Sequence, residues 1–148
     1  MTEAAYSAHP ALTVTADAAL PALCLAALLL PAIAQRKGRL ACPGLFWICA
    51  FGSIALLYAV RQLDHQIGWW ASHQLRFSSH TALGISVAVT LSVFRPVLLP
   101  LLAVLLAGYF WLIVYLQYHH PADIYTTAAA ILPLSLLCHL PWALKRRA

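Results

Sequence analysis

Two short segments of the chain combine histidine with the partners that histidine needs for catalysis. The first is Ser78-Ser79-His80, and the second places His119 four residues before Asp123. A carboxylate four residues away on a helix can bind one ring nitrogen of a histidine and set its tautomer. A histidine held in this way can act as a nucleophile, and a second histidine can act as an acid. The two segments therefore predict covalent acid–base chemistry if the fold brings them together.

Serine and proline beside these histidines predict that each segment begins a helix. Ser78 and Ser79 are favourable N-cap residues for a helix beginning near His80, and Pro121 suits the first turn of another helix. The first N–H groups of a helix have no acceptor within the helix, so two facing helix N-termini favour a bound anion. Together with the histidines, this predicts a phosphate site and phosphoryl transfer.

The composition predicts which elements must hold these residues. The chain has 148 residues, of which 63% are hydrophobic and 9% charged, with a mean hydropathy of +0.82. Soluble domains are about a quarter charged, so this composition excludes a water-soluble globular domain and a disordered segment. A helix needs about 20 apolar residues to span a membrane. We therefore predict a single all-α integral-membrane domain over residues 1–148, a polytopic helix bundle of about five transmembrane helices. The predicted spans are 18–34, 40–60, 79–94, 97–116 and 124–144, with a polar loop at 61–76.

The basic residues predict how this bundle is oriented. They cluster beside the ends of apolar runs, at Arg36, Lys37, Arg39, Arg95, Lys145, Arg146 and Arg147. Cytoplasmic loops are rich in Lys and Arg, so we expect residues 145–148 to form a cytoplasmic basic tail and residues 1–17 an extracytoplasmic segment. The helix starts at 79 and 124 then share the outer face. Clusters placed in this way indicate topology rather than binding to nucleic acid.

The two histidine segments resemble signatures of a known family of membrane enzymes. Phe77-Ser78-Ser79-His80 resembles P-S-G-H, and His119-x3-Asp123 resembles the end of S-R-x5-H-x3-D, from the type 2 phosphatidic acid phosphatase superfamily. The resemblance implies that His119 is a nucleophile that forms a phosphohistidine, that Asp123 orients it and that His80 protonates the leaving oxygen. It also implies that Ser78 and the amides of Ser79 and His80 hold the phosphate.

Several signature residues of that family are replaced in this chain. The first signature, K-x6-R-P, is absent, because both lysines, Lys37 and Lys145, lie on the predicted cytoplasmic face. The arginine that precedes the nucleophile in the third signature is Ile113 here. Arg61 and Arg76 are then the outer-face cations that remain to bind a phosphate. The chain also resembles the sphingomyelin-synthase-like branch, whose H-Y-x-x-D pattern lacks that arginine, so a phosphotransferase fits as well as a hydrolase.

The expected function is therefore a phosphatase or phosphotransferase for lipid phosphates or diphosphates, acting with no metal or other cofactor. We expect it in a bacterial inner (plasma) membrane, with its active face outside the cytoplasm. Its partners would be its substrate and membrane lipids, no nucleic acid is expected, and a homo-oligomer is compatible with the sequence. Two alternatives stay open. The missing family Lys and Arg favour a catalytically inactive member of the same fold, and the seven histidines of the chain favour a metal or haem protein.

Overall fold

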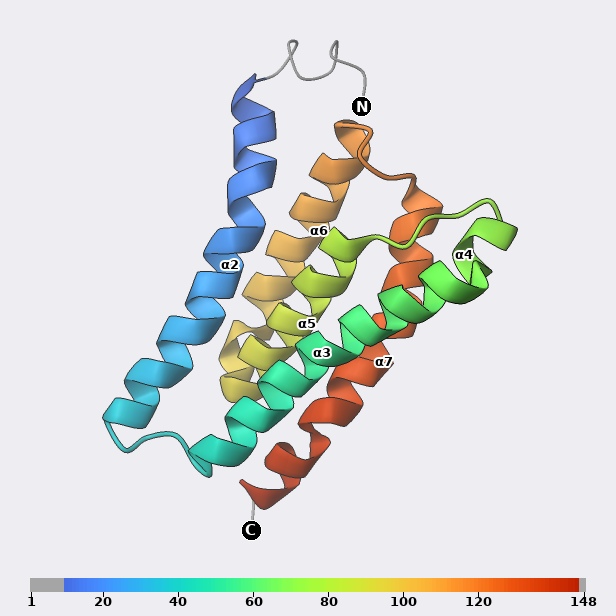
Figure 1. Ribbon diagram of the computed structural model, residues 1–148. Coiled ribbons are helices and arrows are strands. Elements are labelled where there is room, and N and C mark those ends of the chain that lie inside the picture. The colour runs from blue at the N-terminus through green and yellow to red at the C-terminus, as the bar shows by residue number, and fades with distance from the viewer. Residues whose placement is uncertain (1–9, 147–148) are drawn as a thin grey trace.

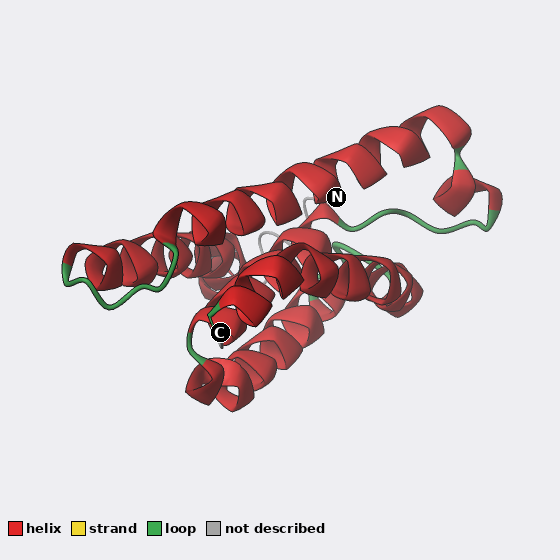
Figure 2. Cartoon of the chain, turned by 90° about the horizontal axis from the view of Figure 1, so that it is seen from below, coloured by secondary structure: helices red, strands yellow, loops and turns green. Residues whose placement is uncertain are grey.

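The computed structural model describes residues 10–146, and every regular element in this range is helical (Figures 1 and 2). The elements are α2 (Pro10–Arg36), α3 (Pro43–Ile67), α4 (Trp69–Ser72), α5 (Ser79–Phe94), the 3-10 turn η1 (Pro96–Leu98), α6 (Leu99–Tyr115) and α7 (Pro121–Lys145). Helices α2, α3 and α7, and α6 together with η1, are long and apolar enough to cross a membrane. The prediction of an all-α polytopic membrane bundle is confirmed.

The shorter apolar helix α5 forms the centre of the bundle. It has 16 residues, which correspond to about 24 Å at 1.5 Å per residue. It contacts each of the four longer helices, and its side chains are buried without interruption from Ile85 to Leu91. Small side chains allow this close packing, since a Cβ atom added at Gly84 would lie 3.2 Å from Leu106. Because the four longer helices bury most of α5, its length does not have to match the thickness of the bilayer.

Buried polar pairs fix how α5 and α7 are aligned along their shared interface. The hydroxyls of Ser86 and Ser135 lie 3.1 Å apart, and Thr90 Oγ1 lies 3.1 Å from His139 Nε2. His139 Nδ1 lies 2.9 Å from the Ser135 carbonyl oxygen, so both of its ring nitrogens have partners. Hydrogen bonds between helices contribute about 0.6–2 kcal/mol each in membranes. Their donors and acceptors meet in only one alignment of the two helices. This alignment sets the relative height of the starts of α5 and α7, where the two histidine segments lie.

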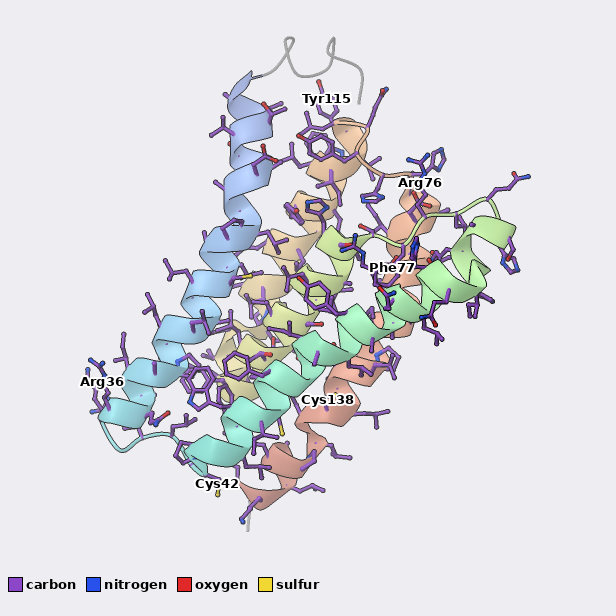
Figure 3. All side chains as sticks on the ribbon, viewed as in Figure 1. Arg36, Cys42, Arg76, Phe77, Tyr115 and Cys138 are labelled. Carbon is purple, nitrogen blue, oxygen red and sulfur yellow. The ribbon has the colours of Figure 1, made fainter. Side chains whose placement is uncertain are left out.

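Six of the eight Lys and Arg residues of the described chain gather at one end of the bundle. Trp142 Nε1 donates a hydrogen bond to the Ala41 carbonyl oxygen (2.7 Å), and Arg146 Nη1 donates to the Val93 carbonyl oxygen (2.9 Å). These bonds bring the α2–α3 loop, the end of α5 and the end of α7 together. Figure 3 shows Arg36 at this end and Arg76 toward the opposite end. The clusters of the sequence therefore form one basic end, while residues 147–148 of the predicted tail lie outside the described residues.

The first helix begins earlier than the sequence predicted. Helix α2 starts at Pro10 rather than at residue 18, so residues 10–17 belong to the helix and not to a separate segment. Ala16 is buried in a cluster with Leu112 and Leu116 of the α6 end. Packing against α6 thus stabilises helical turns that hydropathy alone did not include in the predicted span. Residues 1–9 of the predicted extracytoplasmic segment lie outside the described residues.

The predicted loop at 61–76 is also partly helical. Helix α3 continues through Arg61 to Ile67 and ends at Gly68, which has φ 65° and donates its N–H to the Asp64 carbonyl oxygen (2.7 Å). Asp64 Oδ1 accepts a hydrogen bond from the Trp70 backbone N–H (2.9 Å) and so supports the short helix α4. Residues 73–74 form a turn and residues 75–78 an extended connection into α5, seen in Figure 2 as the long loop after the short helix α4. The prediction of a loop over the whole stretch was wrong because it was based on polarity, and a helix end can be polar.

Candidate active site

Two connections converge at the end of the bundle away from the basic residues. The Arg76 backbone N–H donates a hydrogen bond to Asp123 Oδ1 (2.8 Å), and the Ser78 backbone N–H donates to Thr127 Oγ1 (3.0 Å). Asp123 and Thr127 lie one turn apart on the same face of α7, so they bind alternate N–H groups of an extended segment. These contacts dock the connection before α5 against the start of α7. The fold therefore brings the two histidine segments together, as the predicted acid–base chemistry requires.

The two histidines of the predicted site lie side by side. The ring centroids of His80 and His119 are 6.2 Å apart. His80 is exposed in the first turn of α5, and His119 is half-buried just before α7. A nucleophile and an acid each need to come within about 3 Å of the reacting atoms. At this separation, both rings can reach the same phosphoryl group.

Asp123 binds backbone groups more closely than it binds His119. Its side chain is buried, and Oδ2 accepts a hydrogen bond from the His120 backbone N–H (3.1 Å) while Oδ1 is occupied by Arg76. The distance from Oδ2 to His119 Nδ1 is 3.6 Å, which is an electrostatic contact beyond hydrogen-bonding range. His119 Nδ1 is buried without a hydrogen-bond partner among the described residues. Since Nδ1 faces the carboxylate, Nε2 is the nitrogen left for a substrate.

The surroundings of His119 favour its neutral form. Burial lowers the pKa of His119 below its usual value of 6.5, and the positive charges of His80 and Arg76 act in the same direction. The nearby Asp123 carboxylate raises the pKa of His119 but does not outweigh burial. A neutral imidazole has a lone pair for nucleophilic attack, so this environment suits the predicted role of His119.

An open pocket of about 710 Å³ lies beside these residues. Arg76, His119 and Asp123 line it, so a cation, an imidazole and a carboxylate face the same space. Gln74 and Gln117 also line it, each with a left-handed backbone at φ 58°. That conformation costs a residue other than glycine about 1–2 kcal/mol. Both glutamines follow the end of a helix, where the left-handed turn directs the chain back toward the pocket.

Ser78, one of the two N-cap residues that the sequence predicted, caps α5, but its hydroxyl is turned away from the pocket. Ser78 Oγ accepts hydrogen bonds from the Thr81 backbone N–H (3.3 Å) and from Thr81 Oγ1 (2.9 Å). The Ser78 side chain is 0% exposed, so the predicted phosphate contact through this hydroxyl does not fit the geometry. Ser79, the first residue of α5, is half-buried and leaves its backbone N–H at the helix N-terminus.

The two predicted phosphate-binding arginines lie in different places. Arg76 is exposed at the pocket and its main chain is bound to Asp123. Arg61 lies on α3 and lines another hollow, which it shares with Tyr58, Gln62 and His65. Because α3 continues past Arg61, this side chain is carried by a rigid helix rather than by a loop that could fold back. The structure thus brings Arg76 to the candidate site and places Arg61 apart from it.

Two residues that shape the site were not predicted from the sequence to belong to it. Thr127 is fully buried and holds the Ser78 N–H. Trp70 is 6% exposed, donates from Nε1 to Thr126 Oγ1 (3.2 Å) and packs edge-on against Phe77, with ring centroids 5.2 Å apart. Thr127 follows Asp123 by four residues, and this spacing in the sequence indicates that both lie on one face of a helix.

Within residues 10–146, no three His, Cys, Asp or Glu side chains are grouped so that they could hold a metal ion. Comparisons of the chain with protein-family models, with curated proteins and with solved structures gave no match. The geometry of His80, His119, Asp123 and Arg76 is therefore what indicates a function.

Proposed function

We propose that this protein is a membrane lipid-phosphate phosphatase or phosphotransferase that acts through a phosphohistidine at His119. The observation that carries the proposal is the convergence of His80 and His119 from two helix starts, next to a pocket that His119, Arg76 and Asp123 line. The apolar bundle favours an amphiphilic substrate whose phosphate can reach that pocket. The residues match the chemistry of the type 2 phosphatidic acid phosphatase superfamily, which we propose as the family of this chain.

The proposed reaction has two steps. His119 Nε2 attacks phosphorus, the bond from phosphorus to the ester oxygen breaks, and protonated His80 gives its proton to that oxygen. Water or an acceptor alcohol then attacks the phosphohistidine, and His80 removes the proton from the attacking oxygen. The bond from phosphorus to Nε2 breaks, which releases phosphate or the new ester and restores His119. The Asp123 carboxylate stabilises the positive charge that the His119 ring carries between the steps.

Phosphate binding would rely on Arg76 and on the start of α5. A phosphoryl transition state spreads negative charge over its outer oxygens, which fixed cations and N–H groups stabilise. The backbone N–H groups of Ser79 and His80 lie in the first turn of α5, where they have no acceptor within the helix. A helix N-terminus supplies only about half a positive charge. Arg76 would therefore provide most of the charge that a dianionic headgroup needs.

The direct test is phosphate release by purified protein from a panel of lipid phosphates and diphosphates, with EDTA present. We expect release that EDTA does not reduce, because the nucleophile is a side chain and not metal-bound water. No release from any member of the panel, and no transfer to an added alcohol, would favour the inactive alternative of the same fold.

The pH dependence of catalysis should report the neutral form of His119. Attack requires an unprotonated ring, so kcat/KM should fall as the pH drops through a pKa below 6.5. Replacing Asp123 by Asn removes a charge that raises this pKa, so the acidic limb should move to lower pH. Arg76→Gln removes a charge that lowers it, so the limb should move to higher pH. The measurement is kcat/KM against pH for the three proteins, and shifts in the same direction would contradict this assignment.

Arg76 and Arg61 should differ in their importance for phosphate binding. Arg76→Ala should lower kcat/KM at least about tenfold, which corresponds to roughly 1.4 kcal/mol. Arg61→Ala is the matched control, since it also removes an arginine that the sequence places on the outer face. Its effect on kcat/KM should be much smaller because Arg61 lines a different hollow. Arg76→Lys should recover part of the activity, since lysine keeps the charge and loses the bidentate geometry. Equal effects of the two alanine substitutions would show that neither arginine contacts the phosphate specifically.

We also propose that the site faces the outside of a bacterial plasma membrane, because the opposite end of the bundle is the basic one. In a background without the four native cysteines, Gln66→Cys should react with a membrane-impermeant thiol reagent in intact cells. Lys37→Cys, in the basic α2–α3 loop, should react only after the cells are permeabilised. Both positions are exposed, so a reversed pattern would place the site in the cytoplasm.

A further inference from the structure

A long apolar groove runs between α6 and α7, with α5 as its floor. Its volume is about 690 Å³. Alanines line both walls, Ala103 and Ala107 on α6 and Ala128 and Ala143 on α7, so the short side chains leave the space open. Leu132 and Leu136, which also line it, are 44% and 49% exposed, as expected for a groove that opens toward lipid.

The outer end of this groove lies next to the candidate active site. Phe110 lines the groove, and Val114, one helical turn further along α6, lines the pocket that contains His119. On α7, Asp123 lines the pocket and Ala128 lines the groove. The pocket and the groove share no lining residue, so the hydrocarbon chain of a molecule with its phosphate in the pocket has to pass the turn of α6 from Val114 to Phe110 to enter the groove.

The groove is longer than one leaflet of a bilayer. From Ala128 to Arg146, both of which line it, α7 rises about 27 Å at 1.5 Å per residue. The hydrocarbon core of a bilayer is about 30 Å thick, so one leaflet accounts for about 15 Å. A chain that fills the groove would pass the midplane and approach the basic end of the bundle.

The width of the groove fits one hydrocarbon chain. The groove is about 21 Å long from Pro96 to Phe110 and about 27 Å long from Ala128 to Arg146, so a volume of about 690 Å³ gives a mean cross-section of about 26–33 Å². Carbon atoms in contact lie about 3.5–4.0 Å apart, so a single chain needs roughly 20 Å². A helix with its side chains is about 10 Å wide and needs about 80 Å², so a helix from a second copy could lie over the open side of the groove but not within it.

We propose that this groove holds the chain of the substrate, and that the substrate is the phosphate or diphosphate ester of a long, single-chain alcohol. The inference rests on the proposed function for the position of the phosphate. A two-chain glycerolipid would leave its second chain outside the groove. The groove thus favours a long alkyl or isoprenyl ester over phosphatidate.

Chain length and position in the groove can be tested together. The substrates are octyl, hexadecyl and tetracosyl phosphate in nanodiscs, the last with a chain about as long as the hydrocarbon core is thick. Ala107→Phe, in the outer half, should raise KM at least about tenfold, roughly 1.4 kcal/mol, for the two longer esters and leave octyl phosphate unchanged. Ala143→Phe, near the inner end, should raise KM for tetracosyl phosphate alone. Ala129→Phe is the matched control, since Ala129 lies on α7 but lines a different hollow.

Two results would overturn the inference while leaving the proposed function intact. One is a uniform change of KM for all three esters in the Ala107→Phe protein. The other is an unchanged KM for tetracosyl phosphate in the Ala143→Phe protein, which would show that the chain does not reach the inner half.

A readout without catalysis separates the inference from the proposed function. Tetracosyl phosphate with a photoreactive group on its terminal carbon should label the inner part of α6 or α7 near Ala143, and Ala143→Phe should reduce this labelling. Such labelling without phosphate release from any ester would support the groove and contradict the proposed enzyme. Phosphate release without labelling near Ala143 would support the proposed enzyme and contradict the groove as the site of the chain.

Discussion

Replacing His119 by alanine should reduce kcat/KM for lipid phosphates at least about a thousandfold, roughly 4 kcal/mol, because the proposed covalent intermediate cannot form. Loss of a nucleophile in other covalent enzymes costs this much or more. The protein should remain folded, since His119 Nδ1 is buried with no hydrogen-bond partner among the described residues, so the substitution breaks no hydrogen bond there. We therefore expect an inactive protein with an unchanged or slightly raised Tm.

Rapid acid or alkaline quench with a labelled substrate gives the decisive measurement. Wild-type protein should retain label that is stable in alkali and labile in acid, as for a phosphohistidine, and His119→Ala should retain none. His65→Ala is the matched control, because His65 is exposed on α3 and lines a hollow away from the site. Equal labelling of wild type and His119→Ala would move the nucleophile to another residue.

Replacing His80 by alanine should have the second-largest effect, and this effect should depend on the leaving group. General acid catalysis contributes about 100- to 10,000-fold. For alkyl phosphates, whose alkoxide is a poor leaving group, His80→Ala should lower kcat/KM by about that factor. For p-nitrophenyl phosphate, whose leaving group needs no proton, formation of the phosphohistidine should change little. Because His80 is exposed at the start of α5, its replacement by alanine should leave the protein folded.

The comparison of the two substrates separates acid catalysis from phosphate binding. If His80 mainly held the phosphate, its removal would reduce the reaction of both substrates equally. An equal reduction would therefore contradict the role of His80 as the acid, although His119 could still be the nucleophile.

Local features of the sequence were sufficient for much of the architecture. Hydropathy depends on a run of neighbouring residues, and it predicted the all-α membrane bundle and the bounds of α5. Capping depends on a few adjacent residues, and it predicted Ser78 as the cap of α5 and Pro121 in the first turn of α7. The pairing of the two histidine segments was predicted from the number of spans, which places both helix starts at the same end.

Contacts between distant residues decided what the sequence left open. The bonds from Arg76 and Ser78 to Asp123 and Thr127 join residues nearly fifty positions apart, and they depend on how α5 and α7 are aligned. The same packing turned the Ser78 hydroxyl inward and left Arg61 on an extended helix, away from the pocket.

The sequence by itself thus determined the class of fold, the two helix starts and the candidate histidines, because hydropathy and capping act over a few turns. Tertiary structure decided that Asp123 binds backbone N–H groups more closely than His119, and that Arg76 rather than Arg61 lines the pocket. It also decided that an apolar groove about 21–27 Å long lies between α6 and α7, one turn of α6 from that pocket. These features depend on the separation and alignment of whole helices, which side-chain packing sets and no local pattern records.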